Sequence, residues 1–356
     1  MKMFALFLPQ FHEIPENNEW WGQGFTEWFN VRKAKPLFKG HVQPLHPLNG
    51  NYYNLLDKET VEWQTRLLHD YNVDGMIYYH YYFKGKMLLE KPAENLLKWK
   101  DIDQPFFFCW ANHDWNRAWE GSRTLLQKQE YGTEADWEAH FQYLLPFFKD
   151  ERYEKKDNKP LFMIFNSNFP ERKEMIAYLG KRCRDEGFAG LYVIETYNLG
   201  YDKESIEKMY ADKTDETERI YLREPSCIRG IFWLTPGNLL NRIKWIIIHR
   251  LGLTRLRVTS SSAMYKHVRK EELSPKYVHG IDFGFDNTPR HGIRGDIVTP
   301  PDRKTFESVM DYYKNEDYIF INAWNEWAEG MTLEPTEENG YKFLEWIRDW
   351  RKTNAV

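Results

Sequence analysis

The sequence is poor in cysteine and has no long apolar run. Its three cysteines, Cys109, Cys183 and Cys227, are far apart and odd in number, so they predict neither a disulfide framework nor a zinc site, and we expect reduced thiols. No stretch reaches the roughly 18 apolar residues of a transmembrane helix. The apolar run at residues 3–8 is too short for a signal peptide and lacks a small-residue cleavage site. We therefore expect a buried strand there and a cytoplasmic location.

Phosphate-binding and metal-binding patterns are missing as well. The chain has no phosphate loop, and Gly22-Gln23-Gly24 lacks the third glycine of a dinucleotide-binding turn. The eleven histidines show no His-x-x-x-His spacing, so we expect neither a metal nor another cofactor. A net charge of −4 argues against general nucleic-acid binding.

Aromatic residues are abundant. They make up 17% of the 356 residues, with 15 Trp and 22 Tyr, whereas 42% hydrophobic and 29% charged residues are typical of a soluble globular protein. Aromatic faces are apolar while the Trp N–H and the Tyr O–H are polar, a combination that suits sugars.

Short apolar runs alternate with helical stretches along the chain. Strands are predicted at 3–8, 73–82, 105–111, 160–166, 190–197, 219–225, 277–285 and 318–324, and amphipathic helices at 58–71, 134–149, 171–187, 302–314 and 338–352. This alternation indicates a parallel sheet, and eight units predict an α/β fold of the (β/α)8 TIM-barrel type, as a single catalytic domain over 1–356. A doubly wound open sheet is the alternative, but it would need the nucleotide site that the sequence lacks.

Polar and aromatic residues follow six of the eight predicted strands. A (β/α)8 barrel gathers its active site at the carboxyl ends of the strands, so these residues are candidates for sugar contacts. The candidates are His12, His80, Trp110, Asn112, Asp114, Glu195, Tyr197, Asp286, Asn287, Arg290, Trp324, Asn325 and Glu334. A structural role explains any one of them, whereas their coincidence at corresponding positions favours a site. Glu27 and Trp28, in a glycine-bearing segment, are expected to form a rim or lid.

The last predicted strand leads directly into a pair of glutamates. If the chain turns helically there, Glu326 and Glu329 lie on one face with Cβ atoms roughly 5–6 Å apart. Two carboxyl groups at that separation, next to Trp324 and Trp327, are what glycosidic bond chemistry requires. The alternative is an ordinary helix start, where the macrodipole favours Glu. That alternative does not explain the tryptophans, so we interpret the pair as catalytic.

Five segments together carry a family resemblance: residues 7–12, 21–28, 109–112 with Trp115 and Arg117, 285–290 and 325–330. They resemble the WbsX-like proteins of bacterial polysaccharide loci and, through them, the family-99 glycoside hydrolases (endo-α-mannosidases and endomannanases). The resemblance to the WbsX-like group covers almost the whole chain, and the tie to family 99 rests mainly on residues 325–330. His113-Asp114 stands where the WbsX-like pattern usually reads Glu-Asn, a departure that bears on the substrate.

The resemblance implies a retaining carbohydrate-active enzyme that acts on a bacterial surface polysaccharide or on its lipid-linked oligosaccharide precursor. By analogy, Glu326 would remove the proton of the sugar 2-hydroxyl, which attacks C1 to give a 1,2-anhydro sugar, and Glu329 would serve as general acid and then base. We therefore expect a raised pKa at Glu329, caused by its neighbour's charge and by aromatic burial. Glu326 as a direct nucleophile fits the same spacing. Glycosyl transfer and non-catalytic glycan binding are the alternative functions.

One segment departs from this pattern. Residues 225–270 contain no Asp or Glu but nine cations, and we predict a basic and apolar insertion at 225–276, between strands six and seven. Within it, residues 239–257 combine Arg and Lys with a long apolar stretch and a Trp, which is typical of an interfacial helix on an anionic membrane. This predicts peripheral contact with the inner face of the membrane. The alternative is a packed excursion that offers a basic groove to an acidic polysaccharide.

Overall fold

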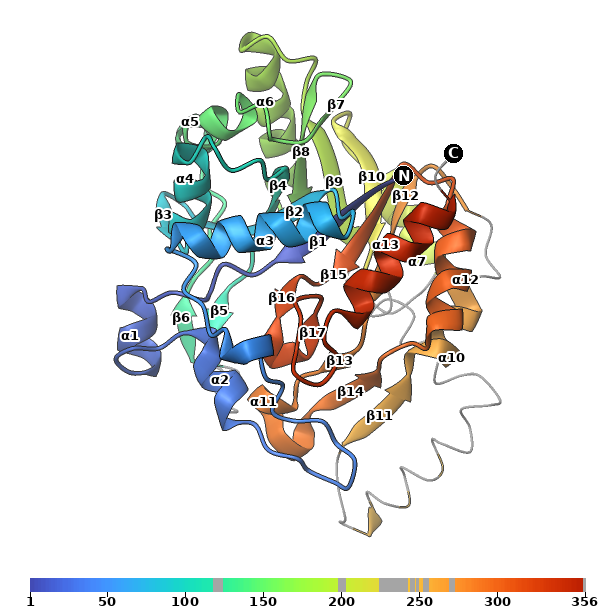
Figure 1. The fold of residues 1–356 in the computed structure, drawn as a ribbon. Helices are drawn as coiled ribbons and strands as arrows, with labels where there is room; N and C mark the ends of the chain where they lie inside the picture. Colours follow the sequence, from blue (N-terminus) through green and yellow to red (C-terminus); the bar gives the residue numbers. More distant parts are fainter. Residues whose placement is uncertain are drawn as a thin grey trace.

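The computed structural model describes residues 1–117, 124–197, 203–223, 243, 247, 250–251, 256–268 and 273–354. Eight parallel strands close into a barrel (Figure 1). In order around it they are β1 (Lys2–Phe7), β2 (Gly75–Phe83), β4 (Phe106–Trp110), β8 (Lys159–Ile164), β9 (Tyr192–Tyr197), β10 (Thr217–Leu222), β12 (Tyr277–Asp282) and β15 (Tyr318–Asn322). Because β1 pairs with both β15 and β2, the sheet has no open edge, and the (β/α)8 prediction is confirmed.

Aromatic rings fill the barrel interior. The ring centroids of Phe4 on β1 and Phe107 on β4 lie 5.2 Å apart. Phe320 on β15 lies 5.7 Å from Phe107 and 5.2 Å from Tyr221 on β10. These strands are not neighbours, so the rings meet across the interior. Such a barrel is a packed core rather than a pore, and a ligand site has to be built at the strand ends.

The five predicted helices are confirmed, with ends that shift by a few residues. They are α3 (Lys58–Asp70), α5 (Glu134–Phe148), α6 (Arg172–Asp185), α12 (Arg303–Tyr313) and α13 (Lys342–Asn354). Side-chain caps fix some of these ends: Asp302 accepts a hydrogen bond from the backbone N–H of Thr305 at 2.7 Å, at the start of α12. The shorter helices of the described residues were not predicted; they include α4 (Lys91–Lys98), α7 (Lys203–Ala211) and α10 (Ser261–Val268). The helices lie outside the strands (Figure 1).

Small elements decorate the carboxyl ends of the strands. After β1 come α1 (Pro15–Trp21), α2 (Glu27–Lys33) and the 3-10 turn η1 (Leu48–Gly50). β3 (Lys86–Leu88) turns back and pairs antiparallel with the end of β2, and the hairpin of β5 (Trp115–Asn116) and β6 (Leu125–Gln127) follows β4. After β12 come β13 (Phe285–Asp286), α11 (Thr288–His291), η3 (Gly292–Arg294) and β14 (Asp296–Thr299). After β15 come β16 (Asn325–Glu326), η4 (Trp327–Glu329) and β17 (Met331–Thr332). At the opposite end, β7 (Lys155–Lys156) precedes β8.

The predicted insertion lies between β10 and β12. Its described part includes β11 (Arg257–Ser260), which pairs with β14, and α10. The rest of residues 225–276, and most of the segment 239–257 predicted to contact a membrane, lie outside the described residues. Within the residues that the structure describes, no helix is long and apolar enough to cross a membrane.

Candidate active site

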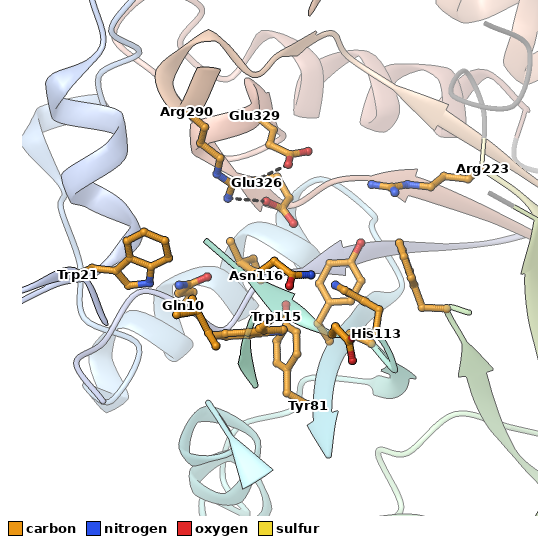
Figure 2. Close-up of a pocket in the computed structure, with 16 residues that line it drawn as sticks. Gln10, Trp21, Tyr81, His113, Trp115, Asn116, Arg223, Arg290, Glu326 and Glu329 are labelled. Atoms are coloured by element: carbon orange, nitrogen blue, oxygen red, sulfur yellow. Dashed lines mark hydrogen bonds and ion pairs between the residues drawn. The ribbon is translucent and has the colours of Figure 1, made fainter. Parts of the chain in front are cut away.

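A cavity of about 340 Å³ lies at the carboxyl ends of the barrel strands. Its wall comes from six strands or the residues that follow them, together with α1, α11 and the β5–β6 hairpin. The lining residues are Leu8, Gln10, Trp21, Tyr79, Tyr81, Ala111, His113, Asp114, Trp115, Asn116, Leu126, Phe165, Arg223, Arg290, Glu326 and Glu329. Figure 2 shows the two glutamates on one side of the cavity, with Trp115, Tyr81 and His113 facing them from the other.

One guanidinium group draws three carboxylates together. Arg290 on α11 donates from Nε and Nη2 to Oε1 of Glu27 at 3.0 and 2.7 Å. Its Nη1 donates to Oε1 of Glu329 at 2.5 Å, and its Nη2 lies 3.7 Å from Oε2 of Glu326 (Figure 2). The structure therefore brings the predicted glutamate pair to a shared cation. Glu27 is fully buried on α2 behind this cation, so the expectation of a rim or lid position for it is corrected.

A tight turn sets the separation of the glutamate pair. Glu326 ends β16, and Glu329 ends the 3-10 turn η4, in which residues three apart fall on the same side. Gly330 closes the turn at a φ of +62°, and a Cβ added there would lie 2.9 Å from Cβ of Asp286. Positive φ and this close approach both require glycine, which explains why Gly follows the second glutamate.

Burial determines where the pair holds a proton. Glu326 is 7% exposed, and its Oε2 accepts no hydrogen bond from the residues described. Burial first, and then the charge of Glu329, raise the pKa of Glu326 to about 8, while Arg290 opposes the rise. The sequence-based expectation placed the raised pKa on Glu329. The structure raises that of Glu326, because Glu326 is the more deeply buried and Arg290 contacts Glu329 more closely.

Glu334 holds the glutamate segment in place from outside the cavity. Its carboxylate accepts hydrogen bonds from Trp324 Nε1 at 2.9 Å and Trp327 Nε1 at 2.7 Å, which flank Glu326 in sequence. It also accepts from Tyr53 Oη at 2.8 Å and Gln64 Nε2 at 2.7 Å. Burial raises its pKa to about 7, against the effect of these four donors. The structure thus gives Trp324 and Glu334 scaffolding contacts rather than places in the cavity wall.

Asn325 fastens the same segment to the first strand. Its Oδ1 accepts from the backbone N–H of Leu8 at 2.7 Å, and its Nδ2 donates to the Leu8 carbonyl at 3.0 Å.

Asp286 and Asn287 form hydrogen bonds that hold the segment carrying Arg290. Asp286 accepts from Gln43 Nε2 at 2.8 Å, and Asn287 Oδ1 accepts from the backbone N–H of Asp296 at 2.7 Å.

The side of the cavity across from the glutamates is aromatic. The rings of Tyr81 and Trp115 meet edge to face, with centroids 5.0 Å apart. Burial raises the pKa of Tyr79 and of Tyr81 well above their usual 10, so both phenols are hydrogen-bond donors at neutral pH. Burial and the nearby charge of Arg223 lower the pKa of His113, which keeps the ring neutral. Asp114, the predicted residue on this wall, accepts from the backbone N–H of Gln129 at 2.7 Å.

Two predicted residues face the helices instead of the cavity. His80 on β2 lies with Nε2 2.9 Å from His140 Nε2 on α5. Trp110 on β4 packs edge-on against Tyr131 and donates from Nε1 to the Tyr82 carbonyl at 3.1 Å. Side chains alternate along a strand, and the neighbours of these two residues face the cavity in their place.

The other predicted residues are buried off the cavity wall. Glu195 binds Nη1 of Arg172 at 2.8–2.9 Å and accepts from Thr217 Oγ1 at 2.7 Å. Asn112 exchanges two 2.7 Å hydrogen bonds with the backbone of Asn166, which ties the end of β4 to the loop after β8. Tyr197 and His12 are also buried, and burial lowers the pKa of His12 to about 4, so it is neutral at physiological pH.

Several cavity residues were not among the predicted ones. They are Gln10, Trp21, Tyr79, Tyr81, His113, Trp115, Asn116 and Arg223. For β2, a signal was present: Ile77, Tyr79 and Tyr81 share one face of the strand, and His80 lies on the other. Arg223 follows β10 and falls inside the predicted strand 219–225, and nothing in its immediate sequence marks it. In the described part of the chain, no three His, Cys, Asp or Glu side chains gather as metal ligands.

Comparison with known proteins supplies a family and a fold. Residues 3–347 match the family described as "Glycosyltransferase WbsX". The protein WxcX of Xanthomonas campestris pv. campestris (strain ATCC 33913) is 30% identical over 357 residues, which cover 97% of this chain and 49% of WxcX. WxcX of strain B100 matches with the same identity and coverage. The chain thus spans about half the length of the curated relatives it matches.

Solved structures share the barrel. The GH99 endo-alpha-mannosidase from Bacteroides thetaiotaomicron superposes with a TM-score of 0.55 at 16% identity, covering 99% of this chain and 98% of the other. A "glycoside hydrolase-like protein" superposes with a TM-score of 0.61 at 12% identity, covering 98% and 93% of the two chains. At these identities the likeness concerns the fold.

Proposed function

The chain belongs to the WbsX glycosyltransferase family, and we propose that it is a carbohydrate-active enzyme that cleaves a glycosidic bond with retention. The substrate would be a bacterial surface polysaccharide or its lipid-linked precursor. One observation carries this proposal: Glu326 and Glu329 meet at Arg290, in the wall of an aromatic cavity at the carboxyl ends of the barrel strands. Paired carboxyl groups beside aromatic rings suit the cleavage of a sugar linkage.

The resting state and the working state of the pair differ by the position of one proton. With its pKa raised to about 8, Glu326 holds the proton at neutral pH, while Glu329 binds Arg290. A sugar 2-hydroxyl that donates a hydrogen bond to Glu326 favours the charged form of that carboxyl. Substrate binding then shifts the proton of the coupled pair towards Glu329, where the leaving oxygen needs it.

The chemistry follows in two balanced steps. First, Glu326 removes the 2-hydroxyl proton, O2 attacks C1, the bond from C1 to the leaving oxygen breaks, and Glu329 protonates that oxygen. Second, Glu329 takes a proton from water, the water oxygen attacks C1 and opens the 1,2-anhydro ring, and Glu326 returns the proton to O2. Two inversions at C1 give net retention. Direct attack of Glu326 on C1 is the alternative that the same geometry accommodates.

Glycosyl transfer is the second candidate function, and the family description favours it. A sugar hydroxyl in place of water in the second step makes the same site a transglycosylase. Transfer from a nucleotide sugar usually involves a metal-binding Asp-x-Asp after a strand. Here Asp101 and Asp103 precede β4, so they lie at the end of the barrel opposite the cavity.

Product analysis tests the proposal. The protein is incubated with polysaccharides and lipid-linked oligosaccharides of the producing organism, and products are measured by mass spectrometry. Hydrolysis gives fragments whose masses sum to the substrate plus water, whereas transfer gives products larger than the starting oligosaccharide. If no glycan changes while one binds with measurable affinity, the barrel is a glycan-binding protein and the proposal fails.

We also propose that residues 239–257 contact an anionic membrane peripherally. Three described side chains at four-residue intervals support this: Ile243, Ile247 and Leu251 are 45, 51 and 66% exposed. The backbone N–H of Leu251 donates to the Ile247 carbonyl at 2.9 Å, as in a helix. Salt-sensitive flotation with anionic liposomes, reduced by Ile247→Glu, is the expected result. Absence of binding at low salt would leave the packed excursion as the explanation.

A further inference from the structure

Arg223 is a cationic residue of the cavity wall that has no part in the proposed chemistry. It follows β10, and its guanidinium points into the cavity, on the far side of the glutamate pair from Arg290 (Figure 2). Its Nε is buried and has no hydrogen-bond partner among the described residues. Its guanidinium lies against the Phe165 ring, whose centroid is 5.4 Å from Cζ. No described carboxylate forms an ion pair with it.

A buried guanidinium without a hydrogen-bond partner is unfavourable for the stability of the unliganded protein. A partly buried guanidinium loses hydration, and Arg cannot discharge itself by releasing a proton near neutral pH. The charge of Arg290, by contrast, is compensated by three carboxyl groups within the chain. Among the described residues no carboxylate pairs with Arg223, which leaves room for a partner that enters the cavity.

Tuning of the glutamates does not account for Arg223. Its charge does lower the pKa of Glu326, but it ranks behind the effects of burial, Glu329, Arg290 and Glu27. Arg290, in direct contact with both members of the pair, already provides the positive charge there.

We propose that Arg223 binds a carboxylate carried by a sugar of the substrate, so that the enzyme acts on an acidic glycan; this inference rests on the function proposed above. The planar guanidinium fork matches a carboxylate with two parallel hydrogen bonds, and the Phe165 ring beside it restrains its plane. Tyr79 and Trp115 line the same cavity and offer aromatic surface to the sugar ring.

Binding measurements in a slow-turnover background test this proposal without requiring turnover. Glu329→Gln protein is titrated calorimetrically with matched methyl glycosides: glucuronic acid with glucose, galacturonic acid with galactose, and mannuronic acid with mannose. At least one acidic sugar should bind roughly 10- to 100-fold more tightly than its neutral partner, as expected of a charge-assisted contact. Adding Arg223→Met should remove the preference, while Arg303→Met, an exposed arginine on α12, should retain it.

A gain-of-carboxylate variant gives an independent readout. His113 and Arg223 both pack against Phe165, with the His113 ring 5.3 Å from that ring, so His113→Glu places an internal carboxylate beside Arg223. The acidic preference should fall as it does for Arg223→Met, although the arginine is intact. A preference that depends on Arg223 but is seen only with glucose 1-phosphate would overturn the carboxylate assignment in favour of a phosphate.

The outcomes separate this inference from the proposed function. If wild-type protein cleaves neutral glycans and no acidic sugar binds in an Arg223-dependent way, the inference fails and the function stands. If an Arg223-dependent acidic preference is measured while no glycan is cleaved or transferred, the function fails and the inference stands.

Discussion

The two arginines of the cavity wall, Arg290 and Arg223, differ in whether carboxyl groups form ion pairs with them. Arg290 is bound by Glu27, Glu326 and Glu329, so its charge is neutralised within the protein. Arg223 lies against an aromatic ring and forms no ion pair with a described carboxylate. A compensated cluster of carboxylates can hold and pass a proton, whereas an uncompensated cation attracts a charged ligand. The difference divides the cavity into a side for chemistry and a side for recognition.

The largest effect should come from the chemical side. Glu329→Gln should lower kcat by roughly 10²- to 10⁴-fold on substrates with poor leaving groups, because the departing oxygen loses its proton donor. Binding of the glycan should change little. The matched control is Glu345→Gln, an exposed glutamate of α13, which should keep full activity. Normal turnover of a natural glycan by Glu329→Gln would remove Glu329 from the mechanism.

The next largest effect should be a difference in the free energy of unfolding between variants of the two arginines. Arg290→Met leaves three carboxyl groups together without their cation and should lower the free energy of unfolding by about 3–5 kcal/mol at pH 7. The loss should shrink at lower pH, as the abandoned carboxylates become protonated. Arg223→Met should keep or raise the free energy of unfolding, because it breaks no ion pair with a described carboxylate and removes a buried charge without a protein partner. Urea denaturation of both variants, side by side with wild type, measures the contrast. Equal losses of unfolding free energy in the two variants would contradict the difference in charge compensation between Arg290 and Arg223.

The pH dependence of stability isolates Glu326. Its pKa rises from the usual 4.5 to about 8 on folding, so below pH 4.5 it is protonated in both states and its contribution to stability is fully present. As the pH rises through 4.5–8 the unfolded chain loses the proton first, and this contribution is lost at up to about 1.4 kcal/mol per pH unit. Glu326→Gln removes this dependence. The variant should therefore gain stability relative to wild type between pH 4.5 and 8, as followed by thermal unfolding across that range. Parallel profiles for the two proteins would mean that Glu326 is ionised at neutral pH.

The fold was readable from the sequence because barrel strands are buried on both faces. Every position of β2 and β4 is buried, so the strands appear as continuous apolar runs. The glutamate pair was readable because its geometry depends on a single turn of adjacent residues. The strands and the glutamate pair could both be predicted because each depends on residues that are close together in the sequence.

The remainder of the site depends on contacts that no local pattern shows. The partners of Glu334 on α3 and the loop before it, Gln64 and Tyr53, come 270 and 281 residues earlier in the chain. Glu195 follows the pattern of a site residue, yet Arg172 and Thr217 occupy it. These assignments followed chemical type and position after a predicted strand, and only the packed barrel shows whether a polar side chain meets protein or solvent.

One mass measurement distinguishes proton transfer by Glu326 from direct attack of Glu326 on the sugar. The central claim is that Glu326 and Glu329 move protons and that neither bonds to carbon. Once turnover has identified the cleaved sugar, its 2-deoxy-2-fluoro glycosyl fluoride is incubated with wild-type protein, and the intact protein and its peptides are weighed. Fluorine replaces the hydroxyl that must attack, so we expect an unlabelled protein, while a cyclitol epoxide that mimics the 1,2-anhydro sugar should bind. A peptide that carries Glu326 as the fluorosugar ester would contradict the claim and make Glu326 a nucleophile.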